Sequence, residues 1–176
     1  GELRPSDLQL LEVIKAGFAS VGDLIEKVQL KAALAEAMRL ATEVNKYLDV
    51  HAPWFEIKND RSEAAKSLYT AIQAIDWLKI IFAPFLPETS ERLHQTLAHE
   101  APLFGKPFTQ EVSDSLGSHL VLGLDNENSL AKEGSDSWKA ETLEAGRSFN
   151  QPAALFKKLD HSIVEEERSR LGRASD

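Results

Sequence analysis

A proline at position 53 interrupts the strongest helical pattern in this sequence. The pattern follows the spacing of one helix face and is carried by Ala41, Val44, Tyr47 and Leu48. Pro53 stops it, because the residue before a proline is pushed out of the helical backbone region. Trp54 therefore lies at a rigid helix exit, where the chain has to turn.

Two interpretations of Trp54 are compatible with this position. The proline fixes its backbone while its ring can stay accessible, which is what a stacking platform for an unpaired nucleobase requires. The alternative is a large core anchor at the end of a helix bundle, because buried aromatic side chains are common in globular domains. The sequence leaves both open.

Four segments have the apolar periodicity of amphipathic helices. The first follows an N-cap at Ser6–Asp7, is weakened locally by Gly17 and Gly22, and has its apolar face at Leu8, Leu11, Ile14, Phe18, Val21 and Ile25. The second covers residues 29–49, with its face at Leu30, Leu34, Met38 or Ala37, Ala41, Val44 or Asn45, and Leu48. The third starts at a capping box of Asp60 and Glu63, with its face at Ala64, Leu68, Ile72, Ile75, Leu78 and Phe82. The fourth covers residues 88–97 after a hinge at residues 84–87. Short connections between these helices predict an all-α antiparallel bundle over residues 6–98.

The rest of the chain has a different composition. Residues 99–137 are rich in Gly, Pro, Ser and Asp, and we expect an irregular insertion with one short strand at residues 119–124, where Leu120, Leu122 and Leu124 alternate. Order resumes at Trp138. We expect an extended stretch at residues 152–159 and a last helix at residues 161–171, ended by Gly172. Residues 138–176 would then form a C-terminal segment whose final helix packs back on the bundle.

The charge balance argues against a protein that binds nucleic acid mainly through phosphates. The chain has 28 acidic and 20 basic residues, a formal net charge of -8, whereas proteins that rely on phosphate neutralisation are usually basic. The conflict is smaller if a few exposed bases of a loop are recognised by stacking and base-edge hydrogen bonds. Such binding would be weak and salt-sensitive.

The sequence contains no recognisable catalytic or metal-binding pattern. Its five histidines include no pair at i, i+4 spacing, and the absence of cysteine excludes disulfides and thiolate metal sites. A glycine-rich phosphate loop and a nucleophile elbow are also missing. No apolar run approaches the roughly 20 residues of a transmembrane helix. We expect a soluble cytoplasmic protein that is inactive as an enzyme by itself, and a fragment of a longer chain, because residue 1 is Gly and Met38 is the only methionine.

Three motifs resemble the anticodon-binding helical domain of methionyl-tRNA synthetase, a class I aminoacyl-tRNA synthetase. They are NKYLD at residues 45–49, Ala52-Pro53-Trp54 followed by Lys58, and PFLPETS at residues 84–90. Trp138, Gly146 and LFKKLD at residues 155–160 are similar to the segment that follows this domain. The related valyl, leucyl and isoleucyl domains share the bundle but lack the Pro-Trp signature.

The resemblance implies recognition of the anticodon loop of methionine tRNA. Trp54 and Pro53 match the family's binding positions, and Trp54 would stack on a splayed base. The candidates for shaping that surface or meeting a phosphate are Asn45, Lys46, Tyr47, Asp49, His51 and Lys58.

The resemblance also implies partners. The full-length ligase would use ATP with Mg²⁺, but both active-site signatures of class I synthetases are missing here, so we expect no cofactor and no metal in this chain. The expected partners are the anticodon loop of tRNA and the catalytic domain of the same polypeptide, which Leu155 and Phe156 would meet. We expect the fragment itself to be a monomer.

The chain departs from the family at one point. The other base-reading residues of the family, an Asn and an Arg one helical turn apart, lie on a preceding helix, and no Asn-x-x-x-Arg occurs before Ser6. Two alternatives to an RNA reader remain. One is a helical protein-interaction domain in which Trp54 contacts protein, and the other is a purely structural domain in which Trp54 is buried.

Overall fold

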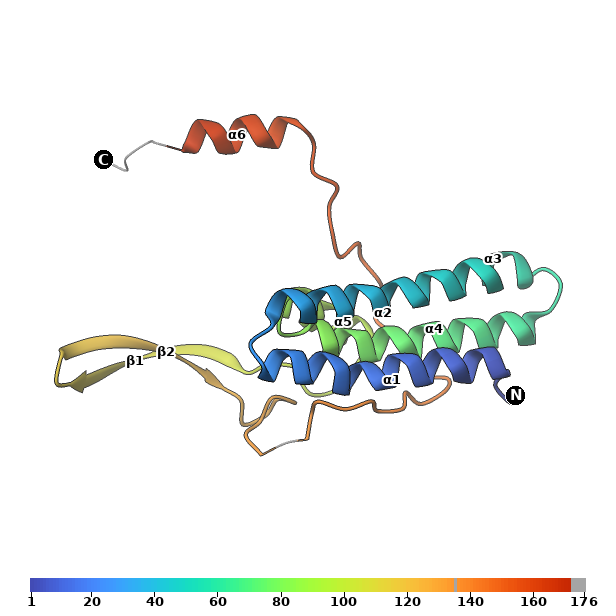
Figure 1. The fold of residues 1–176 in the computed structure, drawn as a ribbon, viewed down its shortest axis with the longest axis horizontal. Coiled ribbons are helices and arrows are strands. Elements are labelled where there is room, and N and C mark those ends of the chain that lie inside the picture. Colours follow the sequence, from blue (N-terminus) through green and yellow to red (C-terminus); the bar gives the residue numbers. More distant parts are fainter. Residues whose placement is uncertain (135, 172–176) are drawn as a thin grey trace.

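The computed structural model describes residues 1–134 and 136–171, a helix bundle from which a β-hairpin and a C-terminal arm extend (Figure 1). The bundle consists of α1 (Pro5–Glu26), α2 (Leu30–His51), α3 (Pro53–Glu56), α4 (Arg61–Phe82) and α5 (Pro87–Thr96). Helices α1, α2 and α4 pack against one another in pairs, and α3 and α5 each contact α4. The predicted bundle is present, with the short helix α3 as an addition.

Local sequence sets the first residues of α4 and α1. Asp60 caps α4, because its Oδ1 accepts hydrogen bonds from the backbone N–H groups of Ser62 (2.8 Å) and Glu63 (3.1 Å). Helix α1 begins earlier than the predicted cap at Ser6–Asp7, with Pro5 in its first turn and Arg4 as N-cap. The Asp7 carboxylate reaches back to the Arg4 backbone N–H (2.8 Å), so Asp7 belongs to the first helical turn.

The core lies between α1, α2 and α4. Its fully buried members include Ile14, Val21, Leu40 and Ile81. Helices α1 and α2 approach closely at Gly17, where an added Cβ would overlap Leu40 Cδ1. Gly17, predicted to be a local weakness of the first helix, is thus the residue that permits this contact.

The predicted core face of α2 is wrong by one position along much of the helix. The buried residues of α2 are Ala33, Ala37, Leu40, Val44 and Tyr47, whereas Leu30, Leu34 and Met38 are exposed. Small alanine side chains thus occupy part of the buried face of α2, at residues 33 and 37, while Leu30, Leu34 and Met38 remain outside it. Of the alternatives at the uncertain positions, Ala37 and Val44 are buried and Asn45 is exposed.

The insertion contains a β-hairpin, so the all-α prediction is corrected. Strand β1 (Lys106–Asp114) pairs antiparallel with β2 (Gly117–Asp125), with Lys106 opposite Asp125. The predicted strand at residues 119–124 lies within β2. Strand β1 escapes sequence-based prediction because Thr109, Gln110 and Glu111 break its apolar alternation.

Residues 138–150 run along the bundle and are held by side-chain hydrogen bonds. Trp138 Nε1 donates to the Phe18 carbonyl (2.8 Å). Gln73 of α4 donates from Nε2 to the Glu141 carbonyl (2.9 Å) and accepts at Oε1 from the Leu143 N–H (2.7 Å). These bonds attach the first part of the C-terminal segment to α1 and α4.

The final helix, α6 (Ser162–Arg170), does not pack on the bundle as predicted. It buries none of its residues, and Figure 1 shows it standing away from the other helices. The physical reason is its composition, since charged residues occupy most of its length and leave no continuous apolar face. The predicted stop at Gly172 lies outside the described residues.

Candidate nucleic-acid interface

The junction between α2 and α3 is a sharp, fixed turn. Helix α2 ends at His51, and Ala52 follows in the left-handed region with φ 35° and ψ 58°. Pro53 then starts α3 and is fully buried. The predicted rigid exit is therefore present, and the short helix α3 begins directly after it.

Trp54 is held outward at this junction. Its side chain is 52% exposed, so the alternative in which it is a buried core anchor is wrong. Three other apolar residues beside it are exposed: Val50, Phe55 and Ile57. The Trp54 and Phe55 rings meet edge-on with centroids 6.4 Å apart. We call these four residues the exit patch.

Sequence reasoning missed three members of the exit patch. The sequence near the proline contains three apolar residues that do not follow helical periodicity: Val50, Phe55 and Ile57. Apolar residues outside the apolar face of a helix have no predicted place in the core, so their position could have indicated that they are exposed. Large apolar side chains that are exposed in one short segment of a folded protein often mark an interaction site. The exit patch is therefore a candidate binding surface.

The polar candidates divide into exposed and engaged residues. Asn45, Asp49 and Lys58 are exposed. Lys46 is exposed as well, but its Nζ forms an ion pair with Glu43 (3.0 Å). Asn45 and Lys58 are thus accessible to a ligand, and Lys46 can reach one only by exchanging its partner.

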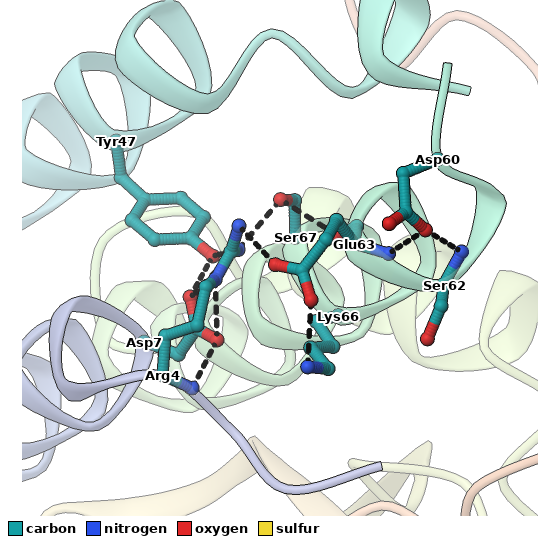
Figure 2. A network of polar contacts seen from close by, with 8 residues as sticks. All are labelled: Arg4, Asp7, Tyr47, Asp60, Ser62, Glu63, Lys66 and Ser67. Carbon is teal, nitrogen blue, oxygen red and sulfur yellow. Dashed lines mark hydrogen bonds and ion pairs between the residues drawn. The ribbon is translucent and has the colours of Figure 1, made fainter. Parts of the chain in front are cut away.

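Tyr47 is a buried part of the fold. Its hydroxyl donates to Asp7 Oδ1 (2.6 Å) and accepts from Arg4 Nη2 (3.1 Å) (Figure 2). His51 is half-buried and lies on the Tyr47 ring, with centroids 4.4 Å apart. Tyr47 therefore positions His51 and the end of α2, and it contributes only a small part of its surface to the groove beside them.

Arg4 is the centre of the network that holds Tyr47. Its guanidinium binds Asp7 through Nη2 (2.8 Å), donates to Ser67 Oγ (2.7 Å) and pairs with Glu63 (3.3 Å) (Figure 2). Burial alone would raise the pKa of Asp7, but hydrogen bonds from Arg4 and Tyr47 outweigh it and lower that pKa. The pKa of Tyr47 is raised, first by burial and then by its bond to Asp7. Asp7 is therefore ionised and Tyr47 neutral at pH 7. The network that they form with Arg4 joins α1, α2 and α4 at the end of the bundle that carries α3.

A groove of about 230 Å³ lies between α1 and α2 beside this junction. Polar atoms reach it from Gln9 of α1 and from Lys46 and His51 of α2, and Val50 of the exit patch also lines it. Such a groove has room for a planar ring and offers it hydrogen-bonding groups.

The described residues offer little for other classes of site. Within residues 1–134 and 136–171, His, Asp and Glu side chains form no group of three or more that could hold a metal ion. In the same part of the chain, no helix is long and apolar enough to cross a membrane.

Comparison with known proteins gives consistent matches. The family model of the anticodon binding domain of methionyl tRNA ligase matches residues 1–119. The methionine–tRNA ligase of Thermomicrobium roseum is 48% identical over 171 residues, which are 97% of this chain and 29% of that protein. The methionine–tRNA ligase of Chloroflexus aggregans is 42% identical, over 97% of this chain and 28% of that protein.

A solved structure shares the fold. The apo form of Mycobacterium tuberculosis methionyl-tRNA synthetase superposes with a TM-score of 0.64 at 17% sequence identity, over 91% of this chain and 27% of that one. This chain thus spans less than a third of the length of each of these relatives. The family match and the sequence relatives together show that the chain belongs to the family of methionyl-tRNA ligase anticodon-binding domains.

Proposed function

We propose that this chain recognises the anticodon loop of methionine tRNA, as the C-terminal part of a methionyl-tRNA synthetase. The observation that carries the proposal is the half-exposed Trp54 ring, fixed beside a fully buried proline. A flipped-out base stacking on this ring would gain about 1–3 kcal/mol. Because the backbone that carries the ring is already fixed by the turn at Ala52 and Pro53, less conformational entropy would be lost on binding.

The surrounding residues have distinct roles in this proposal. His51 faces the groove between α1 and α2 and offers a hydrogen-bonding group there, and Asn45 is an exposed amide on the same helix that would also contact the RNA. Lys58 would meet a backbone phosphate. Tyr47 acts as a positioning residue, since its ring carries His51 and its hydroxyl is bound to Asp7.

The net charge of -8 is compatible with this mode of binding. Stacking and base-edge hydrogen bonds depend less on counterion release than a phosphate-clamping surface does. The ligation of methionine to tRNA, with ATP and Mg²⁺, would belong to the remaining part of the polypeptide. The tRNA and that catalytic part are the proposed partners.

Titration with RNA tests the proposal. The protein used is the ligase, in which this chain is extended at its N-terminus. It is titrated with a stem-loop that carries the CAU anticodon and with a second stem-loop in which that triplet is changed. We expect selective binding of the CAU loop, and Trp54→Ala should weaken it by about 5- to 150-fold, the equivalent of 1–3 kcal/mol. Trp54→Phe should retain part of the affinity because it keeps a stacking ring.

Leu116→Ala is the matched control, since Leu116 is 92% exposed at the tip of the hairpin and lies outside the exit patch. It should leave RNA affinity unchanged. The anticodon proposal fails if wild type and Trp54→Ala bind both RNAs alike. In that case a protein-interaction or purely structural domain becomes the better description.

A further inference from the structure

The two faces of the β1–β2 hairpin differ in composition. In the antiparallel register Leu120 lies opposite Glu111, Leu122 opposite Thr109, and Leu124 opposite Pro107. Alternate residues of a strand share a face, so the three leucines form one row, which we call the leucine row. Their side chains are 74%, 71% and 51% exposed, in chain order.

The opposite face of the hairpin covers itself in part. The Phe108 ring lies over Gly123, where an added Cβ would be 2.6 Å from Phe108 Cζ. Val121 on this face is less exposed than either neighbouring leucine, at 38%. The leucine row is thus the face of the hairpin that lacks a cover.

The root of the hairpin is fixed to the bundle. Glu91 of α5 accepts hydrogen bonds from the backbone N–H groups of Leu103 (2.8 Å) and Phe104 (3.1 Å). The Gly105 N–H donates to Asn126 Oδ1 (2.9 Å), and an added Cβ at Gly105 would overlap the Asp125 carbonyl. The direction in which the hairpin leaves the bundle is therefore set by specific contacts.

A two-stranded sheet with an open apolar face has little stability alone, because stable small sheets pack one face against another element. Neither strand has an extensive contact with a helix of the described chain. Figure 1 shows the hairpin extending beyond the bundle at the end opposite α3. Among the described residues, no helix therefore covers the leucine row.

We propose that the leucine row docks on the part of the same ligase polypeptide that lies outside residues 1–176. This inference rests on the proposed function. The relatives have more than two thirds of their length outside the matched region. The anticodon and the amino-acid acceptor lie at opposite ends of a tRNA, so with the anticodon at α3 the part that acts on the acceptor would lie away from α3. The hairpin points in that direction (Figure 1).

Charge argues against RNA as the occupant. Between residues 106 and 125 the hairpin has one lysine, Lys106, against the carboxylates of Glu111, Asp114 and Asp125, and these repel phosphate. A second copy is also disfavoured, because Glu111 lies on the same face as the leucine row and two such faces would enclose like charges. The fitting surface is apolar with a basic group opposite Glu111.

Site-specific photo-crosslinking in the whole ligase tests this docking. Leu122→p-benzoylphenylalanine places the crosslinker on the leucine row, and Val121→p-benzoylphenylalanine is the matched control on the other face of the same strand. We expect the position 122 variant to crosslink within one molecule to a peptide outside residues 1–176, several-fold more than the position 121 variant. Crosslinks to a second copy, to added tRNA or only within this chain would overturn the inference, as would equal yields.

A second pair of variants uses stability as its readout. Leu122→Asp should lower the melting temperature of the whole ligase more than Val121→Asp does, and equal effects would contradict the docking. CAU stem-loop binding is measured on the same proteins. If the crosslink is missing while binding still depends on Trp54, the docking alone is wrong. If the crosslink forms and binding is insensitive to Trp54→Ala, the anticodon function is wrong.

Discussion

The Tyr47 hydroxyl donates a 2.6 Å hydrogen bond to Asp7 Oδ1, across 40 residues of sequence. Asp7 is fully buried and also bound by Arg4, so this bond fixes the last turns of α2 on the first turn of α1. The α2–α3 junction follows directly after these turns. A core contact thereby sets the direction in which Trp54 leaves the bundle.

Tyr47→Phe tests this contact, because it removes the hydroxyl and leaves a buried carboxylate with one donor fewer. We expect the free energy of unfolding to fall by about 1.5–3 kcal/mol, as for other hydrogen bonds to charged groups. Urea denaturation measures this change. Asn45→Ala, an exposed change on the same helix, should stay within about 0.5 kcal/mol of wild type. An unchanged midpoint for Tyr47→Phe would show that the bond contributes nothing.

His94 should make the protein less stable in mild acid. Its side chain is fully buried, and burial, with the nearby Lys79 charge, lowers its pKa to about 4. The unfolded chain binds a proton near the ordinary histidine pKa of about 6.5. The stability that comes from the neutral, buried His94 is therefore complete above about pH 6.5 and is lost as the pH falls toward about 4. Over this range the free energy of unfolding should fall by up to about 1.4 kcal/mol per pH unit.

Denaturation at several pH values measures this slope. His94→Gln keeps a side-chain donor for the Ala101 carbonyl, which Nε2 of His94 binds at 2.8 Å, and it should flatten the slope. His161→Gln, at an exposed histidine, is the control and should leave the slope unchanged. The assignment is wrong if both variants retain the wild-type pH dependence.

Gly17→Ala should destabilise the bundle although alanine is the better helix former. Helix propensity alone predicts a gain of about 1 kcal/mol. In the structure the new methyl group would overlap Leu40 Cδ1 and lie 3.3 Å from Ile81 Cδ1, and overpacking of this kind costs about 1–3 kcal/mol. Ala16→Gly at an exposed neighbouring position should cost about 1 kcal/mol. A higher thermal midpoint for Gly17→Ala would mean that α1 and α2 separate easily here.

Asp76 and Lys79 form a buried ion pair in α4, and His99 Nε2 lies 2.7 Å from the same Asp76 oxygen. Lys79→Met should cost up to about 3–5 kcal/mol of unfolding free energy, because it removes the buried positive charge beside the Asp76 carboxylate and leaves His99 beside it. The double variant Asp76→Leu/Lys79→Met should recover most of that loss, because it removes both charges. Urea denaturation of the single and double variants provides the comparison. Additive losses in the double variant would contradict a coupled pair.

Much of the helical architecture could be predicted from local rules. Pro53 and Asp60 act on the backbone within a few residues, so the end of α2 and the start of α4 lie close to where the sequence predicts them. Which face of α2 is buried depends on a partner distant in sequence. Gly17 on α1 makes room for Leu40, which lies on the same buried face of α2 as Ala33 and Ala37, and no periodicity within α2 contains that information.

The remaining differences have the same origin. Strand β1 owes its existence to pairing with β2, and its own residues lack an apolar alternation. The Tyr47 hydroxyl is buried because it binds Asp7 and Arg4 at the start of α1. Tyr47 belongs to the motif that suggested a binding position, but in the structure it supports the fold.

The sequence by itself determined that a helix must stop before Pro53 and that an indole must follow, because proline acts on the backbone of its immediate neighbours. Only the tertiary structure decided that Pro53 is buried, while the side chains that follow it are exposed, namely Trp54, Phe55 and Ile57. That choice results from the packing of α1, α2 and α4 against one another, and packing depends on contacts between residues far apart in the chain.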